Sequence, residues 1–228
     1  MTAVEEIFPQ VFEIRLGDRR ILATLNLTPG RSFYGEEIIR LGGREYRSWN
    51  PYRSKLAAAM LKGMRTMPIS PGSRVLYLGV ASGTTCSHIS DIVGAEGHVW
   101  GVDFAHRPLR DLVDNLARYR RNVSPILGDA RRPDSYAAML PTVDVVYADV
   151  AQPDQSKIVA DNAELYLEPG GWAMMAIKSR SVDVTQRPRR IYDAQVEVLK
   201  GRGFEVVEVV ELEPYEKDHA MAAARYRT

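Results

Sequence analysis

A carboxylate and a lysine each end an apolar stretch of the chain. Asp149 follows residues 143–148, and Lys178 follows residues 171–177. If these stretches are neighbouring parallel strands, the two side chains face each other above the same edge of the sheet. Lys178 is then partly desolvated, and its pKa responds to Asp149. Such a pair can orient a hydroxyl group and remove or relay its proton. The alternative is an ion pair with a structural role only.

Polar side chains also follow the three preceding strands that we predict, namely Thr84, Asp103 and Asp129. Ligands of open α/β sheets bind outside the carboxyl ends of the strands, so these residues are candidates for a nucleotide site. We expect Asp103 to accept hydrogen bonds from both ribose hydroxyls and Phe104 to pack on the adenine. Asp129, beside Ala130, is expected to accept from the adenine amino group. Each acid taken alone has an alternative, because aspartate is also common in turns.

The stretch from Val75 to Thr85 combines a buried strand, a turn and the start of a helix. Gly79 and Gly83 permit backbone angles and close approaches that a side chain would block. Thr84 and Thr85 present hydroxyl and N–H groups where the helix begins, a natural place for a polar or anionic ligand. The sequence here is typical of the nucleotide-binding turn of a Rossmann-type fold.

A dinucleotide fingerprint requires glycine at three positions of this turn, which are Gly79, Ala81 and Thr84 here. Two of the three lack glycine, which argues against NAD. S-adenosylmethionine has no pyrophosphate that needs the clearance of the second glycine, so a methyltransferase turn tolerates Ala81. We therefore expect Gly79, Ala81, Thr84 and Thr85 to contact S-adenosylmethionine.

Composition excludes several classes of protein. The 228 residues carry a net charge of +1, so a nucleic-acid partner requires local basic patches rather than overall charge. A single cysteine, Cys86, excludes an intrachain disulfide and a metal site with several cysteines. The four histidines show no metal-ligand spacing, so we expect no metal. We find no signal peptide and no membrane-length apolar run, and we expect a cytoplasmic location. Only 6 of the 30 basic residues are lysines, either because lysine is kept where chemistry needs it or because of codon or temperature bias.

Residues 1–50 predict a small antiparallel β domain that packs on the main body. Residues 11–16 alternate apolar and polar side chains and turn at Gly17-Asp18 into residues 21–25, which indicates a hairpin. A second hairpin is expected from residues 34–41 and 44–47. Asn50-Pro51 then predicts the start of a helix to about residue 63, with Lys55 one turn in.

Residues 51–228 predict an S-adenosylmethionine-dependent methyltransferase domain of the α/β class. Strands and helices alternate, which favours a mostly parallel sheet with helices on both faces. The loop near residue 214 requires an antiparallel last strand. We predict seven strands, at 74–78, 98–102, 123–127, 143–148, 171–177, 204–210 and 220–226, and main helices at 84–93, 108–119, 154–166 and 188–200.

Several segments together resemble the fibrillarin family, and the resemblance covers nearly the whole chain. They are Trp49–Leu56, Tyr77–Thr85, Asp149–Gln152 and Ile177–Arg180. Tyr77 stands where many methyltransferases have an acid, whereas Asp103 departs from the glutamate expected in the family. The chain lacks the Gly/Arg-rich N-terminal extension of eukaryotic members, so it resembles the archaeal type.

The resemblance implies a Rossmann-like class I methyltransferase that modifies ribose 2′-hydroxyls of rRNA and tRNA selected by box C/D guide RNA, with roles in rRNA and tRNA processing. It implies S-adenosyl-L-methionine as cofactor, S-adenosyl-L-homocysteine as product, and a catalytic set of Lys55, Asp149, Lys178 and His219. It also implies a Nop-domain scaffold protein and a kink-turn-binding ribosomal-type protein as partners. Lys55 and His219 would tune and position the other two residues. The segment Asp149–Gln152, with Val150, Ala151 and Gln152, would contact the cofactor.

Three arginine clusters are candidates for RNA contact: Arg118/Arg120/Arg121, Arg131/Arg132 and Arg187/Arg189/Arg190. Solvated surface charge is the alternative for each. Cys86 and His88 are expected to be packing residues. The rival functions are a methyltransferase acting on protein glutamine or on free RNA, a non-catalytic scaffold that binds the cofactor, and an NAD oxidoreductase.

Overall fold

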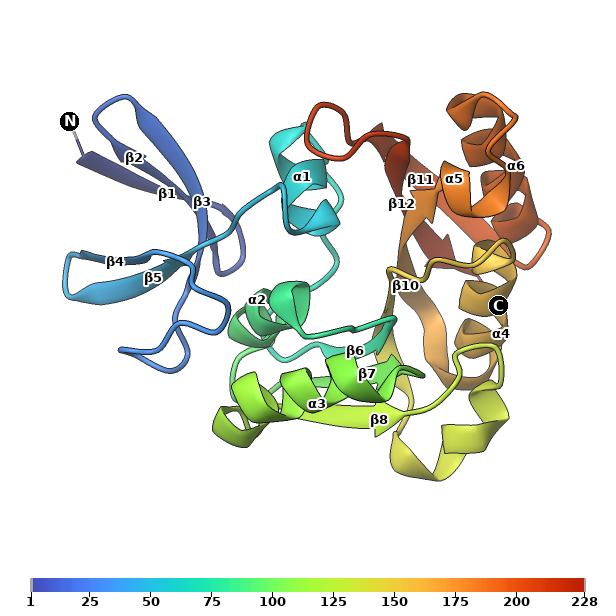
Figure 1. Cartoon of the computed structure of the whole chain (residues 1–228), viewed down its shortest axis with the longest axis horizontal. Coiled ribbons are helices and arrows are strands. Elements are labelled where there is room, and N and C mark those ends of the chain that lie inside the picture. The colour runs from blue at the N-terminus through green and yellow to red at the C-terminus, as the bar shows by residue number, and fades with distance from the viewer. Residues whose placement is uncertain (1, 228) are drawn as a thin grey trace.

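The computed structural model describes residues 2–227, which form two β-sheets (Figure 1). The N-terminal sheet is antiparallel, in the order β1-β2-β3-β5-β4. Its strands are β1 (Thr2–Phe8), β2 (Val11–Leu16), β3 (Arg19–Leu25), β4 (Ile38–Leu41) and β5 (Arg44–Ser48). Both predicted hairpins are present, as β2–β3 and β4–β5. Strand β1 was not predicted, because most of its side chains are exposed and its sequence lacks a buried stripe.

The main sheet has seven strands in the order β11-β12-β10-β9-β6-β7-β8. The fold class predicted from the sequence is therefore confirmed. The last strand, β12, lies between β10 and β11 and is antiparallel to both, whereas the pairs from β10 to β8 are parallel. The strands are β6 (Arg74–Leu78), β7 (His98–Asp103), β8 (Val123–Leu127), β9 (Val143–Ala148), β10 (Leu167–Lys178), β11 (Phe204–Glu211) and β12 (His219–Tyr226).

Helices cover both faces of the main sheet, with α1, α2 and α3 on one side and α4, α5 and α6 on the other (Figure 1). Their bounds are α1 (Lys55–Leu61), α2 (Thr84–Val93), α3 (His106–Asn115), α4 (Gln155–Tyr166), α5 (Ser179–Val182) and α6 (Pro188–Lys200), with 3₁₀ turns at Ala117–Tyr119 and Pro133–Met139. Along β6, Val75 and Tyr77 pack in the core on the α1–α3 side, whereas Leu76 and Leu78 pack on the α4–α6 side. Because alternate side chains point to opposite faces, a strand buried on both faces is apolar throughout.

The start of helix α1 corrects the sequence prediction. Asn50 does not cap the helix; its Oδ1 accepts a hydrogen bond from the Tyr52 N–H at 2.9 Å and closes a turn. The helix begins at Lys55, and its cap is Ser54, whose Oγ accepts from the Ala57 N–H. The Thr85 hydroxyl of α2 donates to the same Ser54 Oγ at 2.9 Å. This contact fixes α1 on α2 and makes Lys55 the first helical residue.

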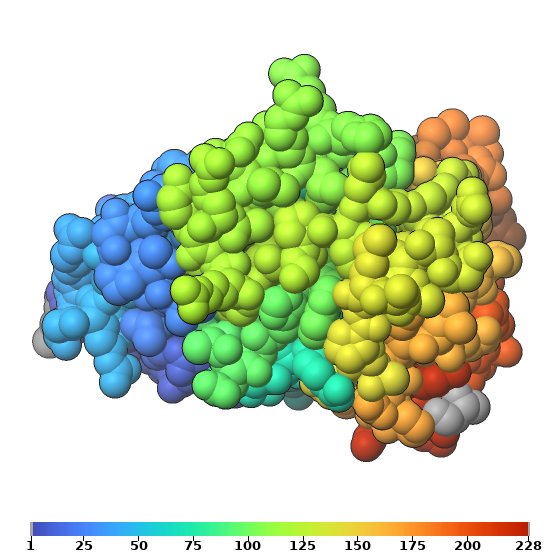
Figure 2. Space-filling model, turned by 90° about the horizontal axis from the view of Figure 1, so that it is seen from below, coloured from blue at the N-terminus to red at the C-terminus, as the bar shows by residue number. Residues whose placement is uncertain are grey.

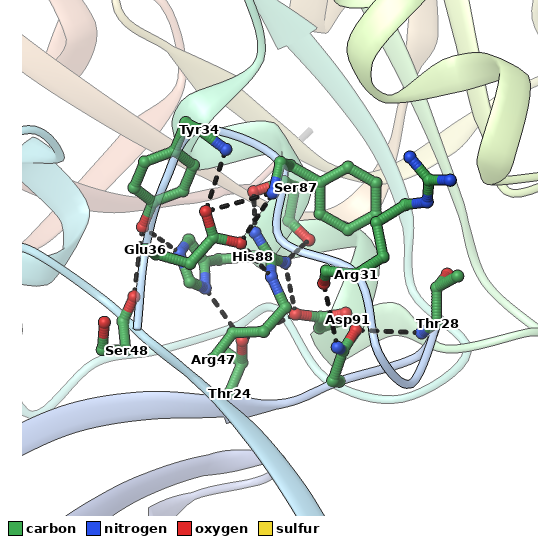
Figure 3. A network of polar contacts seen from close by, with 12 residues as sticks. Thr24, Thr28, Arg31, Tyr34, Glu36, Arg47, Ser48, Ser87, His88 and Asp91 are labelled. Atoms are coloured by element: carbon green, nitrogen blue, oxygen red, sulfur yellow. Dashed lines mark hydrogen bonds and ion pairs between the residues drawn. The ribbon is translucent and has the colours of Figure 1, made fainter. Parts of the chain in front are cut away.

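A buried polar cluster joins the N-terminal sheet and its loop to helix α2, which covers the main sheet, and we call it the inter-sheet network (Figure 3). It comprises Thr24, Tyr34, Glu36, Arg47, Ser87, His88, Asp91 and Arg120. The Arg47 guanidinium, 0% exposed, donates to Glu36 Oε1 at 2.6 Å and to Asp91 Oδ2 at 2.7 Å. Arg120 donates to the other Asp91 oxygen at 2.6 Å. In Figure 2 the N-terminal residues lie directly against the region of α2 and α3.

His88 of α2 is a packing residue, as predicted, but it also completes this network. Its ring stacks on Trp49 with centroids 4.5 Å apart. The Thr24 hydroxyl donates to Asp91, so it must accept from His88 Nδ1 at 2.8 Å. The Tyr34 hydroxyl lies 2.5 Å from Nε2 and 3.2 Å from the Ser48 carbonyl, and its one proton can serve either acceptor. In a neutral ring, Nε2 is the acceptor. Burial, with the charges of Arg47 and Arg120, lowers the His88 pKa well below its usual value.

Within residues 2–227, no helix combines the length and apolar character needed to cross a membrane. The same residues include no group of three or more His, Cys, Asp or Glu side chains arranged to hold a metal ion.

Candidate active site

Three charged side chains predicted from the sequence meet at the carboxyl ends of β9 and β10. Lys178 Nζ lies 2.7 Å from Asp149 Oδ1 and donates to the Asp149 backbone carbonyl at 2.8 Å. Lys55 Nζ lies 3.2 Å from Asp149 Oδ1 and 3.3 Å from Oδ2. Each of the three side chains is 15% exposed. The carboxylate is therefore held between two ammonium groups and still reaches solvent.

Three separate elements fix these side chains. Asp149 follows β9, and its N–H donates to the Leu78 carbonyl of β6 at 2.9 Å. Lys178 ends β10, where its N–H donates to Gln155 Oε1 at 3.0 Å. Lys55 is held by the capped start of α1. Strands β9 and β10 are parallel neighbours, which is the condition on which the pairing of Asp149 with Lys178 was predicted.

His219 completes the site from the antiparallel strand. It is the first residue of β12, and the register pairs it with Lys178 of β10. Its Nδ1 lies 2.6 Å from the Lys217 carbonyl, and a carbonyl only accepts, so Nδ1 carries the proton and Nε2 has a lone pair. Burial lowers the pKa of His219, and the charges of Lys55 and Lys178 act in the same direction. We call Lys55, Asp149, Lys178 and His219 the active-site cluster.

Glu216 is a neighbour of the cluster that was not predicted. Its Oε1 lies 3.9 Å from Lys55 Nζ, and its Oε2 lies 3.7 Å from His219 Nδ1. It belongs to the loop between β11 and β12, whose Asp218 has the left-handed φ of 61°. An acid three residues before His219 was the only sequence signal, and many surface loops contain one.

A cavity of about 280 Å³ opens beside Asp149, at the ends of β6, β7, β8 and β9. It contains most of the predicted cofactor residues. The lining residues are Gly79, Ala81, Val102, Asp103, Phe104, Ala105, Pro108, Gly128, Asp129, Ala130, Arg131, Asp149, Val150, Ala151, Gln152 and Ile158. Clefts at the carboxyl ends of parallel strands are the usual ligand sites of open α/β sheets.

Thr84 and Thr85 are not among the residues that line this cavity. They begin helix α2, directly after Gly83 in the left-handed region. Thr85 is buried, and its hydroxyl donates to Ser54. Thr84 lines a separate cavity with Tyr34 and Arg53. Their contact with the cofactor stays a prediction.

Asp103 lies at the wall of the cavity, and its contact with a ribose stays a prediction. One carboxylate oxygen accepts from the Ala81 N–H at 2.9 Å, and the other accepts from the Ala105 N–H at 2.9 Å. Each oxygen keeps a further lone pair for a ribose hydroxyl. Asp129 is different, because the Arg131 guanidinium contacts both of its oxygens and lowers its pKa. Its contact with an adenine amino group stays a prediction.

Gly79 brings β6 close to the backbone of the β9–α4 loop. Its φ is 75°, and a Cβ built there would lie 3.0 Å from the Asp149 carbonyl oxygen and 3.2 Å from a Val150 methyl group. Real Cβ atoms do not approach a backbone oxygen so closely without displacing it. A side chain at position 79 would therefore move Asp149, which both lines the cavity and belongs to the active-site cluster.

The charge of the cavity suits an adenosine-containing cation. Of the described residues that line it, three supply carboxylates, Asp103, Asp129 and Asp149, and one supplies a guanidinium, Arg131. An acidic lining favours a positively charged sulfonium ligand and disfavours a pyrophosphate. Phe104, 66% exposed, adds an open aromatic ring at the cavity wall. The residues present thus fit S-adenosylmethionine and do not fit NAD.

The arginine clusters have different environments. Arg120 is buried against Asp91, so its assignment to an RNA-contacting cluster is wrong. Arg131 is exposed but paired with Asp129. Exposed side chains remain at six positions: Arg118, Arg121, Arg132, Arg187, Arg189 and Arg190. The part played by these residues in RNA binding stays a prediction.

Comparisons with known proteins point to one family. The family model named Fibrillarin matches residues 2–228. The fibrillarin-like rRNA/tRNA 2′-O-methyltransferase of Pyrococcus horikoshii is 54% identical over 220 residues, which cover 96% of this chain and 96% of that relative. The crystal structure of Aeropyrum pernix fibrillarin with natively bound S-adenosyl-L-methionine matches with a TM-score of 0.88 and 49% identity, over 98% of this chain and 100% of that chain. A chain from the fibrillarin/Nop5p complex matches with a TM-score of 0.86 and 38% identity, over 98% and 100%.

Proposed function

This chain belongs to the fibrillarin family, and on that premise we propose that it is an RNA ribose 2′-O-methyltransferase. It transfers the methyl group of S-adenosylmethionine to 2′-hydroxyls of rRNA and tRNA. The observation that carries this proposal is the position of Asp149. Its carboxylate both lines the acidic cavity and lies between Lys55 and Lys178.

The cavity residues hold the cofactor, with Asp103 on the ribose, Phe104 on the adenine, and Val150, Ala151 and Gln152 along the wall beside Asp149. S-adenosylmethionine, when bound, supplies an electrophilic methyl group on a sulfonium centre. The carboxylates of the cavity orient that cation by charge. The active-site cluster must then position the ribose 2′-hydroxyl, which is a weak nucleophile, and remove its proton.

Lys178 and Asp149 perform that work. Lys178 donates one ammonium N–H to the Asp149 carbonyl at 2.8 Å, and its Nζ lies 2.7 Å from Asp149 Oδ1. An ammonium group has three N–H donors, so another is available to hold the oxygen of a ribose hydroxyl. Asp149, or Lys178 in its neutral form, accepts the hydroxyl proton. General base catalysis of this kind contributes about 10²–10⁴-fold to a rate, and alignment of the hydroxyl contributes much of the rest.

Lys55 and His219 position this pair. Lys55 holds the outer side of the Asp149 carboxylate, which limits its rotation. His219 Nε2 is an unprotonated acceptor, because Nδ1 donates to the Lys217 carbonyl. The lowered pKa favours this neutral, accepting form of the ring.

The enzyme works as the catalytic subunit of a ribonucleoprotein. A Nop-domain scaffold protein is its direct partner, as in the fibrillarin/Nop5p complex. Two further partners are part of the proposal: a box C/D guide RNA that selects the target by base pairing, and a kink-turn-binding protein. The exposed residues Arg187, Arg189 and Arg190 at the start of α6 are suited to contact RNA phosphates. The cytoplasmic location stays a prediction from the sequence.

The test is a methylation assay with the full chain, labelled S-adenosylmethionine and a target RNA, followed by mapping of the methylated nucleotide. We expect one 2′-O-methyl group at the guided position, only when guide RNA and both protein partners are present. Equal transfer to naked RNA would contradict the guided mechanism. Transfer to a protein glutamine, with none to RNA, would contradict the substrate. Lys178→Ala should abolish transfer and keep cofactor binding, whereas the exposed Lys200→Ala should change neither.

A further inference from the structure

Tyr52 is a large aromatic residue that is 64% exposed and lies next to the active-site cluster. Among the exposed aromatic side chains of residues 2–227, Phe104 has the comparable value of 66%, and it lines the cofactor cavity. A single exposed aromatic residue needs no explanation by itself. Tyr52 differs in its rigidity and in its position.

Two contacts hold Tyr52 in place without covering it. Its N–H donates to Asn50 Oδ1 at 2.9 Å, in a turn that Pro51 restricts further. Its ring meets the ring of Tyr215 edge to face, with centroids 5.2 Å apart and an interplanar angle of 70°. Tyr215 is itself fixed, because its N–H donates to the Leu212 carbonyl at 2.9 Å. The exposed ring is thus already ordered before any ligand arrives.

Both tyrosines belong to the segments that form one side of the active-site cluster. Tyr52 lies three residues before Lys55, and Tyr215 directly precedes Glu216, whose Oε1 is 3.9 Å from Lys55 Nζ. The cofactor cavity is bounded by Asp149 and the loops after β6, β7 and β8. A ribose hydroxyl at Asp149 and Lys178 is therefore flanked by the cofactor and by the segments that carry these two rings.

Arg53, the residue after Tyr52, adds a positive charge that Tyr34 holds in place. Its Nη1 donates to the Tyr34 carbonyl at 3.1 Å, and its guanidinium lies 4.8 Å from the centroid of the Tyr34 ring. The side chain is exposed, so its other N–H groups remain available to solvent. Tyr52 and Arg53 thus supply an open aromatic ring and a guanidinium at successive positions of the chain. Aromatic rings bind bases and guanidinium groups bind phosphates in single-stranded nucleic acids.

We propose that Tyr52, braced by Tyr215, is a stacking platform for the nucleobase of the target strand nearest to the reacting ribose, and that Arg53 holds the adjoining phosphate. This inference rests on the proposed function. Stacking on a tyrosine ring accepts any base, because every base has a π-face. Such a contact fits an enzyme that must hold many targets in one geometry while base pairing with another RNA selects them.

The direct test is photo-crosslinking in the assembled particle, with 4-thiouridine placed at the methylated position or at either neighbour in the target RNA. We expect a crosslink that maps to the peptide carrying Tyr52 or Tyr215 in the wild-type chain and in Tyr52→Phe, and that is lost in Tyr52→Ala. A crosslink pattern that Tyr52→Ala leaves unchanged would overturn the proposal.

Kinetics supply the second readout. Removing one stacking ring lowers kcat/KM for guided RNA by about 5-fold to 150-fold, the equivalent of ~1–3 kcal/mol. Tyr52→Ala should show this loss with unchanged cofactor affinity, Tyr52→Phe should restore the wild-type rate, and Tyr119→Ala, at an exposed tyrosine of the 3₁₀ turn after α3, should have no effect. A Tyr52→Phe variant as impaired as Tyr52→Ala would instead assign the role to the hydroxyl.

Two controls separate this inference from its premises. If the wild-type particle fails to methylate the guided ribose, the proposed function fails. If the wild-type particle is active and Tyr52→Ala has the same kcat/KM, the stacking role of Tyr52 is contradicted and the proposed function stands. Loss of binding to the Nop-domain partner in Tyr52→Ala, measured by co-purification, would show that the ring contacts protein rather than RNA and would overturn the proposal.

Discussion

The molecule contains the same arrangement of charges twice. In the inter-sheet network, Asp91 lies between Arg47 and Arg120, with His88 beside it. In the active-site cluster, Asp149 lies between Lys55 and Lys178, with His219 at the paired position of β12. In both places burial and two neighbouring cations lower the pKa of the histidine.

The two clusters differ in the cation and in access to solvent. The network uses arginine, and the side chains of Arg47, Asp91 and Arg120 are at most 1% exposed. The active-site cluster uses lysine, at 15% exposure, next to a cavity. An arginine keeps its proton under all working conditions and its donors have fixed directions, whereas a lysine can release a proton. Under the proposed function, the sealed, arginine-bound carboxylate serves stability, and the open, lysine-bound one serves chemistry.

The largest effect is expected from exchanging the cation in the active-site cluster. Lys178→Arg keeps the positive charge but prevents the side chain from accepting a proton. We expect the single-turnover rate of methyl transfer to fall by about 10²–10⁴-fold. The free energy of unfolding should change by less than ~1 kcal/mol, because the pair is partly exposed. Lys200→Arg, at an exposed position of α6, is the matched control. A Lys178→Arg enzyme within tenfold of the wild type would mean that Lys178 supplies only charge.

The opposite result is expected for the inter-sheet network. Arg47→Ala leaves Glu36 and Asp91 buried without one of their cations, and breaking a buried ion pair costs about 3–5 kcal/mol of unfolding free energy. Denaturant unfolding measures this loss. The exposed Arg44→Ala, also in β5, should change stability by less than ~0.5 kcal/mol. Cofactor affinity of folded Arg47→Ala should match the wild type, and a loss confined to cofactor binding would contradict the division between the clusters.

The sequence predicted best what local chemistry determines. The bounds of α2 and α6 were predicted at Thr84–Val93 and Pro188–Lys200, because Gly83 and Pro188 mark their starts locally. The pairing of Asp149 with Lys178 was predicted from one topological rule, that neighbouring parallel strands end at the same edge of the sheet. Lys55 and His219 came only from the family resemblance, since neither has a distinctive local context.

What the sequence could not predict depends on contacts between distant residues. Ser54 rather than Asn50 caps α1 because Thr85, 31 residues away, donates to it. Arg120 is buried because Asp91, 29 residues away, pairs with it, which no local charge pattern reveals. Glu216 comes near Lys55 because the loop between β11 and β12, which is distant from Lys55 in the sequence, lies beside it in the fold.

The smallest predicted effect is a pH dependence of stability, and it distinguishes His88 of the inter-sheet network from His219 of the active-site cluster. His88, and to a lesser extent His98 and His219, have lowered pKa values in the folded state. Below the unfolded value of about 6.5, the unfolded chain binds protons that the folded chain does not. Stability is therefore fully present above pH 6.5 and falls as the pH drops through the folded values, by at most about 1.4 kcal/mol per pH unit for each histidine.

Denaturant unfolding between pH 7.5 and 5.5 checks this expectation, since most carboxylates stay ionised in that range. His88→Gln should flatten the pH dependence of unfolding more than His219→Gln, because the sealed His88 has the larger shift. The rate of methyl transfer should show the reverse order, with His219→Gln altering the acid limb of its pH profile and His88→Gln leaving the limb in place. If both substitutions moved stability and rate together, the two clusters would be one coupled unit. Separate responses would place stability in the arginine-bound aspartate and chemistry in the lysine-bound one.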